Sequence, residues 1–461
     1  MQPQYDVIIV GAGPAGIFAA LELSEKNDFK VLMLEKGPDI SARRCLMKEN
    51  GACVRCNPCS IVSGWGGAGA FSDGKLTLTT DFGGWLDEYM DRSTVAQLIK
   101  YVDSVYLSFG APEHVFGTDK AKIKEIQRQA ARADLSLVPA RIRHLGTEKC
   151  FAILSDMRTQ IAKRVHVRPR TPVRTILVQN GQAVGVETEQ GEIIHARYVI
   201  VAPGRDGSDW FAKEATRLGL EVEVNPVDIG VRVEVPGVVM EHLTDVIYES
   251  KFVFFSKAFD DRVRTFCMNP YGEVVLENNS GLLTVNGHSY AEKSSENTNF
   301  AILVSKTFTE PFKEPISYGK YIASLANLLG GGVLVQRLGD FLSGRRSTLE
   351  RLQRGMVEPT LKAATPGDLS LVLPYRHMVS IVEMLKALDV VAPGVFSRHT
   401  LLYGVEVKFY SSRLELTPEL ETGIKNLFAA GDGAGVSRGL VQASACGVVC
   451  ANAIKARENI H

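Results

Sequence analysis

An apolar run that ends in a glycine-rich turn stands at the beginning of the chain. Residues 5–10 (YDVIIV) form a β-rich run, which predicts a strand buried in a parallel sheet. The turn GAGPAG, residues 11–16, follows at once, and the small and apolar residues 17–23 predict the opening of a helix. Residues 29–34 predict a second strand, which ends at Glu35. The order strand, G-x-G-x-x-G, helix, strand and acid predicts a βαβ unit.

Each residue type in this unit has a mechanical reason to bind a dinucleotide. Gly11 permits the tight turn, Gly13 lets the backbone approach a pyrophosphate, and Gly16 lets the helix pack close to the strand. The helix start offers unpaired N–H groups and a partial positive charge to phosphates. Glu35, 19 residues after Gly16, can accept hydrogen bonds from ribose hydroxyls and disfavours a 2′-phosphate. The unit therefore predicts FAD or NAD, without separating the two.

The far end of the chain repeats the pattern of a strand followed by glycine. Residues 425–430 (KNLFAA) predict a strand, GDGAG at 431–435 ends it, and the small residues from 439 to about 456 predict a helix. The Asp432 carboxylate can hold a sugar-alcohol hydroxyl, and the helix start can face a flavin ring or its phosphate. These features predict a second polar anchor for one extended ligand.

The motifs VIIVGAGPAG, Glu35, VIVAPG (199–204) and LFAAGDGAG (427–435) together resemble the FAD-binding domain of the glutathione-reductase-like flavoprotein superfamily. The stretch SGWGGAGAFSDGKL (63–76), with DIGVRVE, TFCMNP and VNGHS, is similar to a family of bacterial and archaeal FAD-dependent dehydrogenases without an assigned substrate. The superfamily resemblance implies FAD and contacts along its length, and the loop 64–69 is expected to wrap the flavin. The expected contact residues are Gly11, Gly13, Pro14, Ala15, Gly16, Glu35, Lys36, Gly66, Gly67, Ala68, Val173, Ala202, Pro203, Gly204, Gly431, Asp432, Gly439 and Val441.

The middle of the chain predicts how the domains are divided. Residues 175–188 read as strand, Asn-Gly turn and strand, and residues 198–201 return to the main sheet. We expect an α/β protein with a Rossmann-like FAD-binding domain and an inserted α+β substrate domain. The FAD-binding domain is expected at 1–90, 145–215 and 396–461, and the substrate or partner domain at 91–144 and 216–395.

Further elements are expected inside the inserted domain. Residues 93–111, 119–134 and 321–329 have helical composition, while 227–235 and 246–255 read as strands. A second strand–G-x-G-x-x-G–helix–acid unit does not occur in the sequence. Electrons are therefore expected from a nicotinamide that docks directly at the flavin, from a protein carrier, or from the substrate itself.

Four cysteines stand immediately before the glycine-rich loop 64–69. Cys45, Cys53, Cys56 and Cys59 form the pattern C-x7-C-x2-C-x2-C, which could ligate an iron–sulfur cluster or a zinc ion. The fourth cysteine of a ferredoxin run is replaced by Ser63, so Cys45 would have to close the set. A redox-active disulfide and plain thiols are the other interpretations that the pattern leaves open.

Three residues are candidates for the chemistry itself. Lys75, directly after the loop 64–69, could stabilise a reduced, anionic flavin, or could simply face solvent. His288 could donate a proton, or could be a satisfied structural group, and Cys267 lies in another of the family-like segments.

Composition excludes some partners. The 461 residues contain 52 basic and 52 acidic residues, so the chain has no basic excess to favour nucleic acid or an anionic membrane as main partner. Short basic clusters do occur, as at Arg345-Arg346. The sequence shows no membrane span, and its eight cysteines without an export signal fit a reducing cytoplasm.

These observations predict an FAD-dependent oxidoreductase that moves two electrons, as hydride, between flavin N5 and a small organic substrate. One alternative is a flavin-dependent monooxygenase, because GRDGS at 204–208 resembles the D-G segment of such enzymes. Another is an electron-transfer flavoprotein that passes electrons through a cysteine-ligated cluster to a protein partner.

Overall fold

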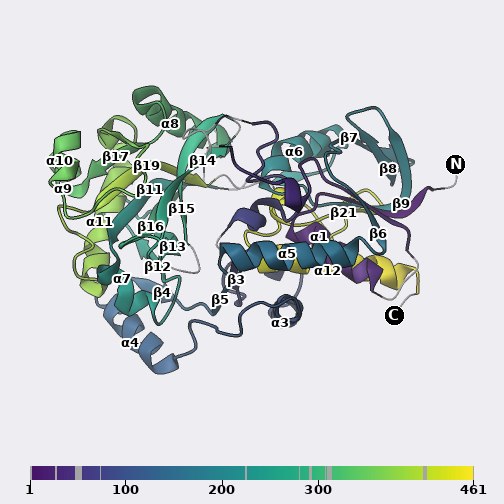
Figure 1. Ribbon diagram of the computed structural model, residues 1–461, viewed down its shortest axis with the longest axis horizontal. Coiled ribbons are helices and arrows are strands. Elements are labelled where there is room, and N and C mark those ends of the chain that lie inside the picture. Colours follow the sequence, from purple (N-terminus) through teal and green to yellow (C-terminus); the bar gives the residue numbers. More distant parts are fainter. Residues whose placement is uncertain are drawn as a thin grey trace. The chain divides into compact units, whose positions relative to one another are not determined.

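The protein is described by a computed structural model, which covers residues 3–25, 29–46, 54, 56–72, 74–223, 226–279, 281–289, 293–306, 308, 314–408 and 413–459 (Figure 1). The chain forms two compact units. Unit 1 consists of residues 1–113, 143–224 and 411–461, and unit 2 consists of residues 114–142 and 225–410. The α/β class expected from the sequence is confirmed.

The core of unit 1 is a sheet of seven strands in the order β6-β2-β1-β9-β8-β7, with β21 also pairing with β9. Strands β6, β2, β1, β9 and β21 run parallel to one another. Val7, Ile8 and Ile9 of β1 are fully buried, as expected of a parallel strand covered on both faces. The strand bounds are β1 Tyr5–Val10, β2 Val31–Leu34, β6 Val165–Arg168, β7 Val173–Gln179, β8 Gln182–Thr188, β9 Ile193–Val201 and β21 Leu427–Ala429.

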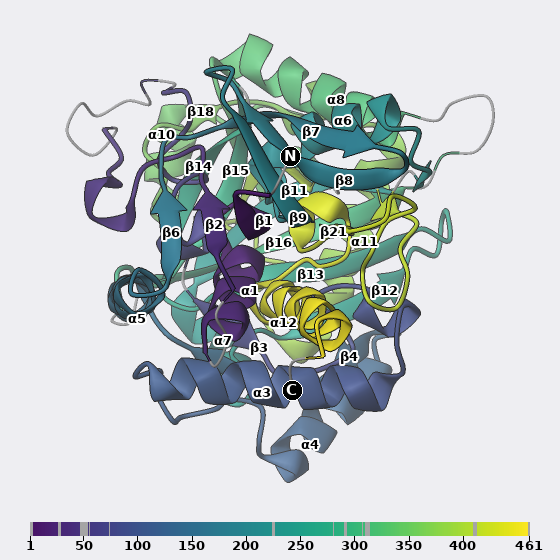
Figure 2. The ribbon, with the colours of Figure 1, turned by 90° about the vertical axis from the view of Figure 1, so that its right-hand side faces the viewer.

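Helices α1 (Pro14–Ser24) and α12 (Leu440–Arg457) pack against each other in unit 1, as Figure 2 shows. Their backbones approach so closely that a Cβ atom added to Gly447 would lie 2.0 Å from the carbonyl oxygen of Ala15. Only glycine therefore fits at this crossing. The close approach of the two helices also sets the positions of their N-terminal ends.

Helix α3 (Arg92–Ser108) packs against α12 and belongs to unit 1. The sequence had assigned residues 91–144 to the inserted domain, and this boundary is corrected because the buried face of α3 (Val95, Ile99 and Val102) joins the core of unit 1. The remaining elements of unit 1 include α5 Thr147–Ile161, α6 Ser208–Arg217, β3 Lys75–Thr77, β10 Val222–Glu223 and β20 Arg413–Leu414. Strand β5 (Ile142–His144) lies where the chain leaves unit 2.

Unit 2 is built on an eight-stranded sheet in the order β18-β17-β19-β11-β16-β13-β12-β4. All neighbouring strands are antiparallel except β17 and β18. The strand bounds are β4 Ser136–Val138, β11 Val227–Pro236, β12 Lys251–Phe255, β13 Arg262–Asn269, β16 Asn297–Lys306, β17 Leu334–Arg337, β18 Thr365–Pro366 and β19 Leu401–Lys408. Strand β19 belongs to this sheet, so the expected start of the last FAD-domain segment at 396 is also corrected.

The two faces of this sheet differ in chemistry. Along β11, Ile229, Val231 and Val233 share one face, because alternate residues of a strand point the same way. That face joins a core to which helix α11 (Tyr375–Val391) contributes. Asp228, Arg232 and Glu234 alternate with them on the opposite face, and all three are buried. The second face therefore carries buried charge.

The hairpin of β14 (Glu273–Asn279) and β15 (Leu282–His288) contacts β11, β13 and β19 through β15. The other helices of unit 2 are α4 Lys120–Ala131, α7 Gly237–Thr244, α8 Pro315–Gly330, α9 Leu338–Leu342 and α10 Leu349–Gln353. Within the residues that the structure describes, none of the helices is both long and apolar enough to cross a membrane.

Candidate cofactor site

The glycine-rich turn after β1 is shaped by its neighbours. Gly11 has a φ of +103°, and an added Cβ there would lie 2.1 Å from the carbonyl oxygen of Ala202. An added Cβ on Gly16 would lie 2.0 Å from the carbonyl oxygen of Gly11. Gly13 differs, because its nearest neighbour would be the Cα atom of Gly67 at 3.9 Å. Gly11 and Gly16 are thus required by the fold, whereas a Cβ on Gly13 would make only an ordinary van der Waals contact.

The N-terminal ends of α1 and α12 converge on the glycine-rich loop 64–69. Gly13 precedes α1 and Gly439 precedes α12, and neither helix start has a side-chain hydrogen-bond cap. An added Cβ on Gly69 would lie 2.7 Å from Leu440 and 3.8 Å from Pro14, the first residues of the two helices. Two helix starts without side-chain caps therefore present N–H groups and partial positive charge beside one loop.

Arg43 contacts the backbone of this loop and of the residues just before it. Its guanidinium donates hydrogen bonds to the carbonyl oxygens of Ser60 (2.9 Å), Ile61 (2.8 Å), Trp65 (2.5 Å) and Gly67 (2.8 Å). The side chain is buried, and burial lowers its pKa to about 10, so it is protonated at neutral pH. The sequence analysis did not identify Arg43, because its four partners lie 17 to 24 residues further along the chain.

Glu35 connects three backbone segments. Its Oε2 accepts a hydrogen bond from the N–H of Ala12 at 2.8 Å, and its Oε1 accepts from Gly37 at 2.8 Å and Gly64 at 2.9 Å. A carboxylate has about four lone-pair positions, so about one remains for a ligand hydroxyl. The acid that ends β2 therefore has a structural task as well as the ligand contact expected from the sequence.

The sequence predicts that Lys36 contacts FAD, and the structure shows that it also forms an ion pair with Asp206. Its Nζ lies 2.5 Å from Oδ2 of Asp206 and 3.1 Å from the carbonyl oxygen of the same residue. Ser63 donates a 2.6 Å hydrogen bond to Asp206. Burial opposes ionisation of Asp206, but the hydrogen bonds from Lys36 and Ser63 outweigh it and lower the pKa of the carboxyl. The D-G segment at 204–208 is thus tied to Lys36 and to the residue before the loop 64–69.

The G-D segment of the C-terminal strand lies against the first turn. Gly431 has a φ of +80°, and an added Cβ would lie 3.2 Å from the Cβ of Ala15. An added Cβ on Gly433 would lie 2.2 Å from the carbonyl oxygen of Gly204. Asp432 accepts a 2.6 Å hydrogen bond from Ser437. The structure therefore brings residues 11–16, 64–69, 202–204 and 431–439 together at the carboxyl ends of β1, β9 and β21.

The cysteine cluster is described only in part, because Cys53 lies outside the described residues. Burial raises the pKa of the Cys59 thiol, and the neighbouring Cys56 adds to the rise. Within the described ranges, no three His, Cys, Asp or Glu side chains gather as a metal site. The set Cys45, Cys53, Cys56 and Cys59 stays a prediction.

The three catalytic candidates lie in different units. Lys75 begins β3 in unit 1, whereas Cys267 and His288 lie on β13 and β15 of unit 2. Cys267 has a φ of +48°, a left-handed conformation that is unfavourable for a side chain of this kind. Its N–H donates to Glu249 at 3.2 Å, and its carbonyl accepts from Arg232 at 2.8 Å and Asn269 at 3.0 Å. Catalytic roles for these three residues stay predictions.

Arg232, whose guanidinium donates to the Cys267 carbonyl, belongs to a buried charge network that local sequence patterns do not indicate. The guanidinium of Arg232 binds the Glu406 carboxylate through two hydrogen bonds of 2.7 and 2.8 Å, and both side chains are fully buried. Lys408 lies 3.0 Å from the same carboxylate. Burial alone would raise the pKa of Glu406, but Arg232 and Lys408 lower it. No local pattern could have paired residues 174 positions apart.

Comparisons with known proteins fit this geometry. Residues 226–409 match the family model described as FAD-dependent protein, C-terminal domain-like, and residues 5–77 match that of pyridine nucleotide-disulphide oxidoreductase. An uncharacterized protein of Clostridium beijerinckii is 27% identical over 471 residues, which cover 97% of this chain and 80% of that protein.

Solved structures also resemble the chain over most of its length. Glycine oxidase from Bacillus cereus is 13% identical, with 98% of this chain and 96% of that chain covered and a TM-score of 0.41. For 3-ketosteroid-delta4-(5alpha)-dehydrogenase from Rhodococcus jostii the identity is 14%, the coverage 98% of both chains and the TM-score 0.44. L-proline dehydrogenase from P. horikoshii is 11% identical, with 99% of this chain and 95% of that chain covered and a TM-score of 0.43. Likenesses this distant say nothing about the substrate of this chain.

The two family matches define the class: the chain is an FAD-dependent oxidoreductase, and FAD is its cofactor. Within that class, residues 226–409 of unit 2 are similar to the C-terminal domain of FAD-dependent proteins. The residues of unit 1 fit this cofactor. The glycine-rich turn 11–16 leaves room beside Gly13, and two helix starts without side-chain caps lie next to it. FAD supplies the hydride-accepting and hydride-donating centre when it is bound.

Proposed function

We propose that this chain is a dehydrogenase or reductase that moves two electrons, as hydride, between flavin N5 and a small organic substrate. The observation that carries the proposal is the convergence of the α1 and α12 starts on the loop 64–69. A single helix start suits one phosphate group. Two starts beside one glycine loop suit an extended ligand that carries both a diphosphate and a flavin.

The proposed contact residues follow from the position of each in the site formed by residues 11–16, 64–69, 202–204 and 431–439. The backbone at Gly13 and Gly67 borders the space that suits the diphosphate, and the lone pair left on Glu35 suits a ribose hydroxyl. Gly431 and Asp432 suit the ribityl chain. The other proposed contacts are Gly11, Pro14, Ala15, Gly16, Lys36, Gly66, Ala68, Val173, Ala202, Pro203, Gly204, Gly439 and Val441.

The protein's own contribution is to position the cofactor and its charge. Arg43 contacts two carbonyls of the loop 64–69 and two just before it, and these contacts hold the loop in one conformation before any ligand arrives, so little ordering entropy is lost on binding. The N–H groups at the start of α12 favour negative charge nearby. The partial positive charge of this helix start would favour an electron-rich, reduced flavin over the oxidised form.

The test is an anaerobic reduction of the purified holoprotein, monitored by its flavin absorbance. NADH, NADPH and small organic donors are added in turn, with deuterium in the transferred position. We expect bleaching by at least one donor, and slower bleaching when the transferred hydrogen of that donor is deuterium. In a separate aerobic assay, NAD(P)H oxidation with oxygen consumption only when substrate is present would instead show a monooxygenase. Stoichiometric iron with one-electron reduction would show an electron-transfer flavoprotein. Either result would overturn the proposal.

A further inference from the structure

Helix α8 of unit 2 carries an apolar stripe on its outer face. Tyr321, Leu325, Leu328 and Leu329 are 74, 40, 80 and 49% exposed, and their spacing places them on one side of the helix. The opposite side, with Ile322, Ala323 and Ala326, is buried in the core of unit 2. Residues 315–330 contain one lysine and no acidic residue. We name the four exposed residues the α8 ridge.

A basic segment follows the α8 ridge along the chain. Residues 315–354 contain six basic and two acidic residues, a net charge of +4 in a chain whose net charge is zero. Of the two acids, Asp340 is fully buried and is held by Arg337, Arg345 and Ser347. Arg345, Arg346 and Arg354 are exposed, as are the apolar residues Leu342 (49%), Leu349 (59%) and Met356 (78%). We name residues 342–356 the arginine segment.

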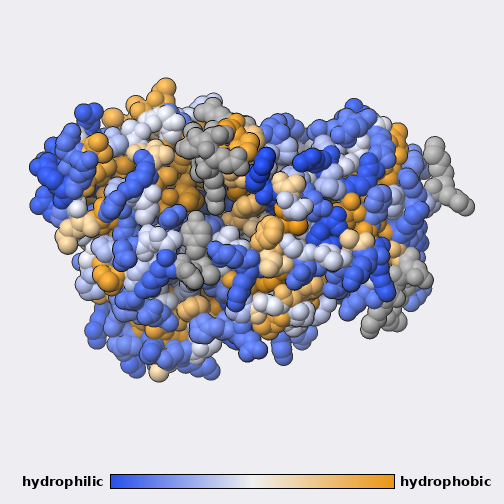
Figure 3. All heavy atoms as spheres, viewed as in Figure 1, coloured by the Kyte–Doolittle hydropathy of each residue, from blue (hydrophilic) through white to orange (hydrophobic). Residues whose placement is uncertain are grey.

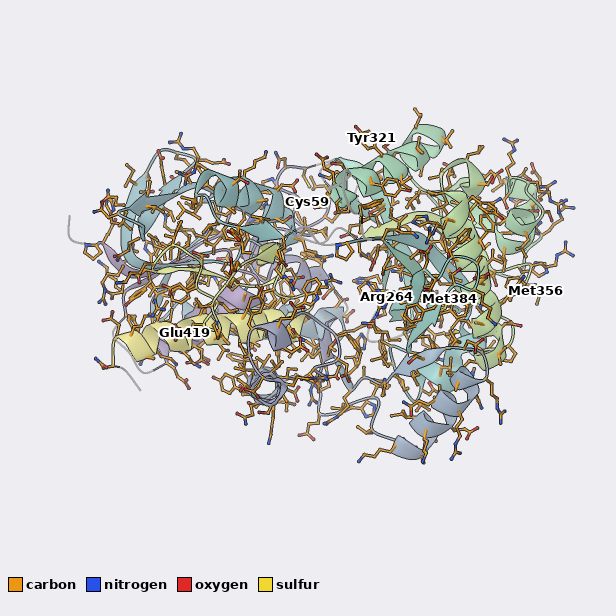
Figure 4. The ribbon with its side chains drawn as sticks, turned by 180° about the vertical axis from the view of Figure 1, so that it is seen from behind. Cys59, Arg264, Tyr321, Met356, Met384 and Glu419 are labelled. Atoms are coloured by element: carbon orange, nitrogen blue, oxygen red, sulfur yellow. The ribbon has the colours of Figure 1, made fainter. Side chains whose placement is uncertain are left out.

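The two features lie on neighbouring elements. Helix α8 ends at Gly330, and residues 331–337, of which the last four form β17, lead to α9, where the arginine segment begins. A strand of this length spans roughly 13 Å. Figure 3 shows apolar side chains over α8 and hydrophilic ones over α9 and α10, and Figure 4 shows Tyr321 and Met356 at the surface of unit 2. Exposed apolar and basic side chains thus lie on elements of unit 2 that follow one another along the chain.

We propose that the α8 ridge and the arginine segment dock this protein on the surface of an anionic lipid bilayer. Leucine and tyrosine side chains on one face of a helix enter the boundary between headgroups and acyl chains. Exposed arginines attract anionic headgroups. Stable attachment needs two such signals, and both are present here.

The charge distribution argues for lipid over the other occupants. A second copy of the chain, paired through α8, would bring two arginine segments of net positive charge close together, which is unfavourable. An acidic protein would satisfy the arginines but would also need a groove for four projecting apolar side chains. A bilayer satisfies both features without a preformed partner surface. This inference is independent of the reaction proposed above.

The experiment is flotation of the holoprotein with vesicles of phosphatidylcholine alone, or with an equal part of phosphatidylglycerol added. We expect binding to the anionic vesicles, weaker binding to neutral ones, and a loss of binding as salt rises. Arg346→Gln with Arg354→Gln should weaken binding about fivefold for each arginine. Leu325→Ser with Leu328→Ser should weaken it by roughly tenfold or more.

Matched control variants separate docking from general surface changes. Ile193→Ser with Val238→Ser removes two apolar residues of similar exposure, and Arg132→Gln with Arg141→Gln removes two exposed arginines elsewhere. The controls should bind vesicles like the parent protein, and all variants should keep their flavin absorbance and melting temperature. Absence of vesicle binding, equal loss in the controls, or a dimer that the leucine variants abolish would each overturn the proposal.

Discussion

The sheets of the two units place their polar groups differently. In unit 1, strands such as β1 are apolar on both faces, and the polar contacts gather in loops at the strand ends. In unit 2, one face of the sheet is apolar and the other buries Arg232, Glu234 and Glu406 within the strands themselves. The comparison teaches that unit 1 offers backbone groups in loops at its strand ends, whereas unit 2 depends on side chains fixed inside its sheet.

The substitution Arg232→Met should have the largest effect, because it should destabilise unit 2 and leave unit 1 stable. The variant leaves the Glu406 carboxylate fully buried with only Lys408 as a charged partner. Loss of one member of a buried ion pair costs about 3–5 kcal/mol of unfolding free energy. We expect unit 2 to lose cooperative unfolding in a denaturant titration while the apolar strands of unit 1 keep their hydrogen-exchange protection.

A double variant, Arg232→Met with Glu406→Leu, is the control. Replacing both members of a buried pair by apolar residues of similar size is often neutral. We expect it to recover most of the lost stability. Equal losses in the single and double variants would mean that packing, rather than unpaired charge, explains the effect.

Acid should also act on unit 2. His377 on α11 is 2% exposed, and neither ring nitrogen has a hydrogen-bond partner among the described residues. Burial lowers its pKa from 6.5 to about 4, with a further contribution from Lys306. The unfolded chain therefore binds the proton more tightly, so stability is lost as pH falls from about 6.5 to about 4.

At about pH 4, the expected loss of unfolding free energy is roughly 3 kcal/mol. It is measured by chemical denaturation as a function of pH. His377→Leu should flatten the curve across the window, because the titrating group is gone. A slope that is unchanged in this variant would assign the acid sensitivity to other groups.

Arg43 is a buried side chain on which the loop 64–69 of unit 1 should depend. Arg43→Lys keeps the charge but cannot reach four carbonyl oxygens at once. We expect roughly tenfold weaker FAD binding, which corresponds to about 1.4 kcal/mol. Fluorescence titration of the apoprotein measures it, with Arg170→Lys, an exposed arginine of unit 1, as control. Unchanged affinity would show that the loop orders without this clamp.

The smallest expected effect concerns Lys36. Its ion pair with Asp206 is about one-third exposed, and pairs of this kind contribute at most about 1 kcal/mol. We expect Lys36→Met to change the melting temperature slightly and the FAD affinity by less than about threefold. A large loss of FAD affinity, measured by the same titration, would show that Lys36 contributes more to FAD binding than one partly exposed contact supplies.

The parts that the sequence predicted are those encoded by local patterns. The βαβ unit from Tyr5 to Glu35 and the Asn180-Gly181 hairpin depend on neighbouring residues, and the structure has strands and a turn there. The strand expected over 227–235 is observed as β11, whereas that expected over 246–255 begins only at Lys251. The helices expected over 93–111, 119–134 and 321–329 appear as α3, α4 and the longer α8.

The parts that the sequence did not predict depend on contacts between distant segments. The membership of α3 in unit 1 follows from its packing on α12, more than 300 residues later. The four carbonyl contacts of Arg43 and the pair of Arg232 with Glu406 leave no local signal. The sequence shows the Arg345-Arg346 cluster, but the exposure of the apolar residues near it depends on the fold.

The central claim is that unit 1 binds FAD in the space beside Gly13. The measurement is FAD titration of apoprotein carrying Gly13→Ala, beside the parent apoprotein. The added Cβ meets only the Cα of Gly67 at 3.9 Å, so the fold should stand unchanged by circular dichroism. The account predicts FAD affinity reduced roughly tenfold to hundredfold, because the methyl group keeps the diphosphate from the backbone N–H groups. A variant that folds and binds FAD with the parent affinity would contradict the account.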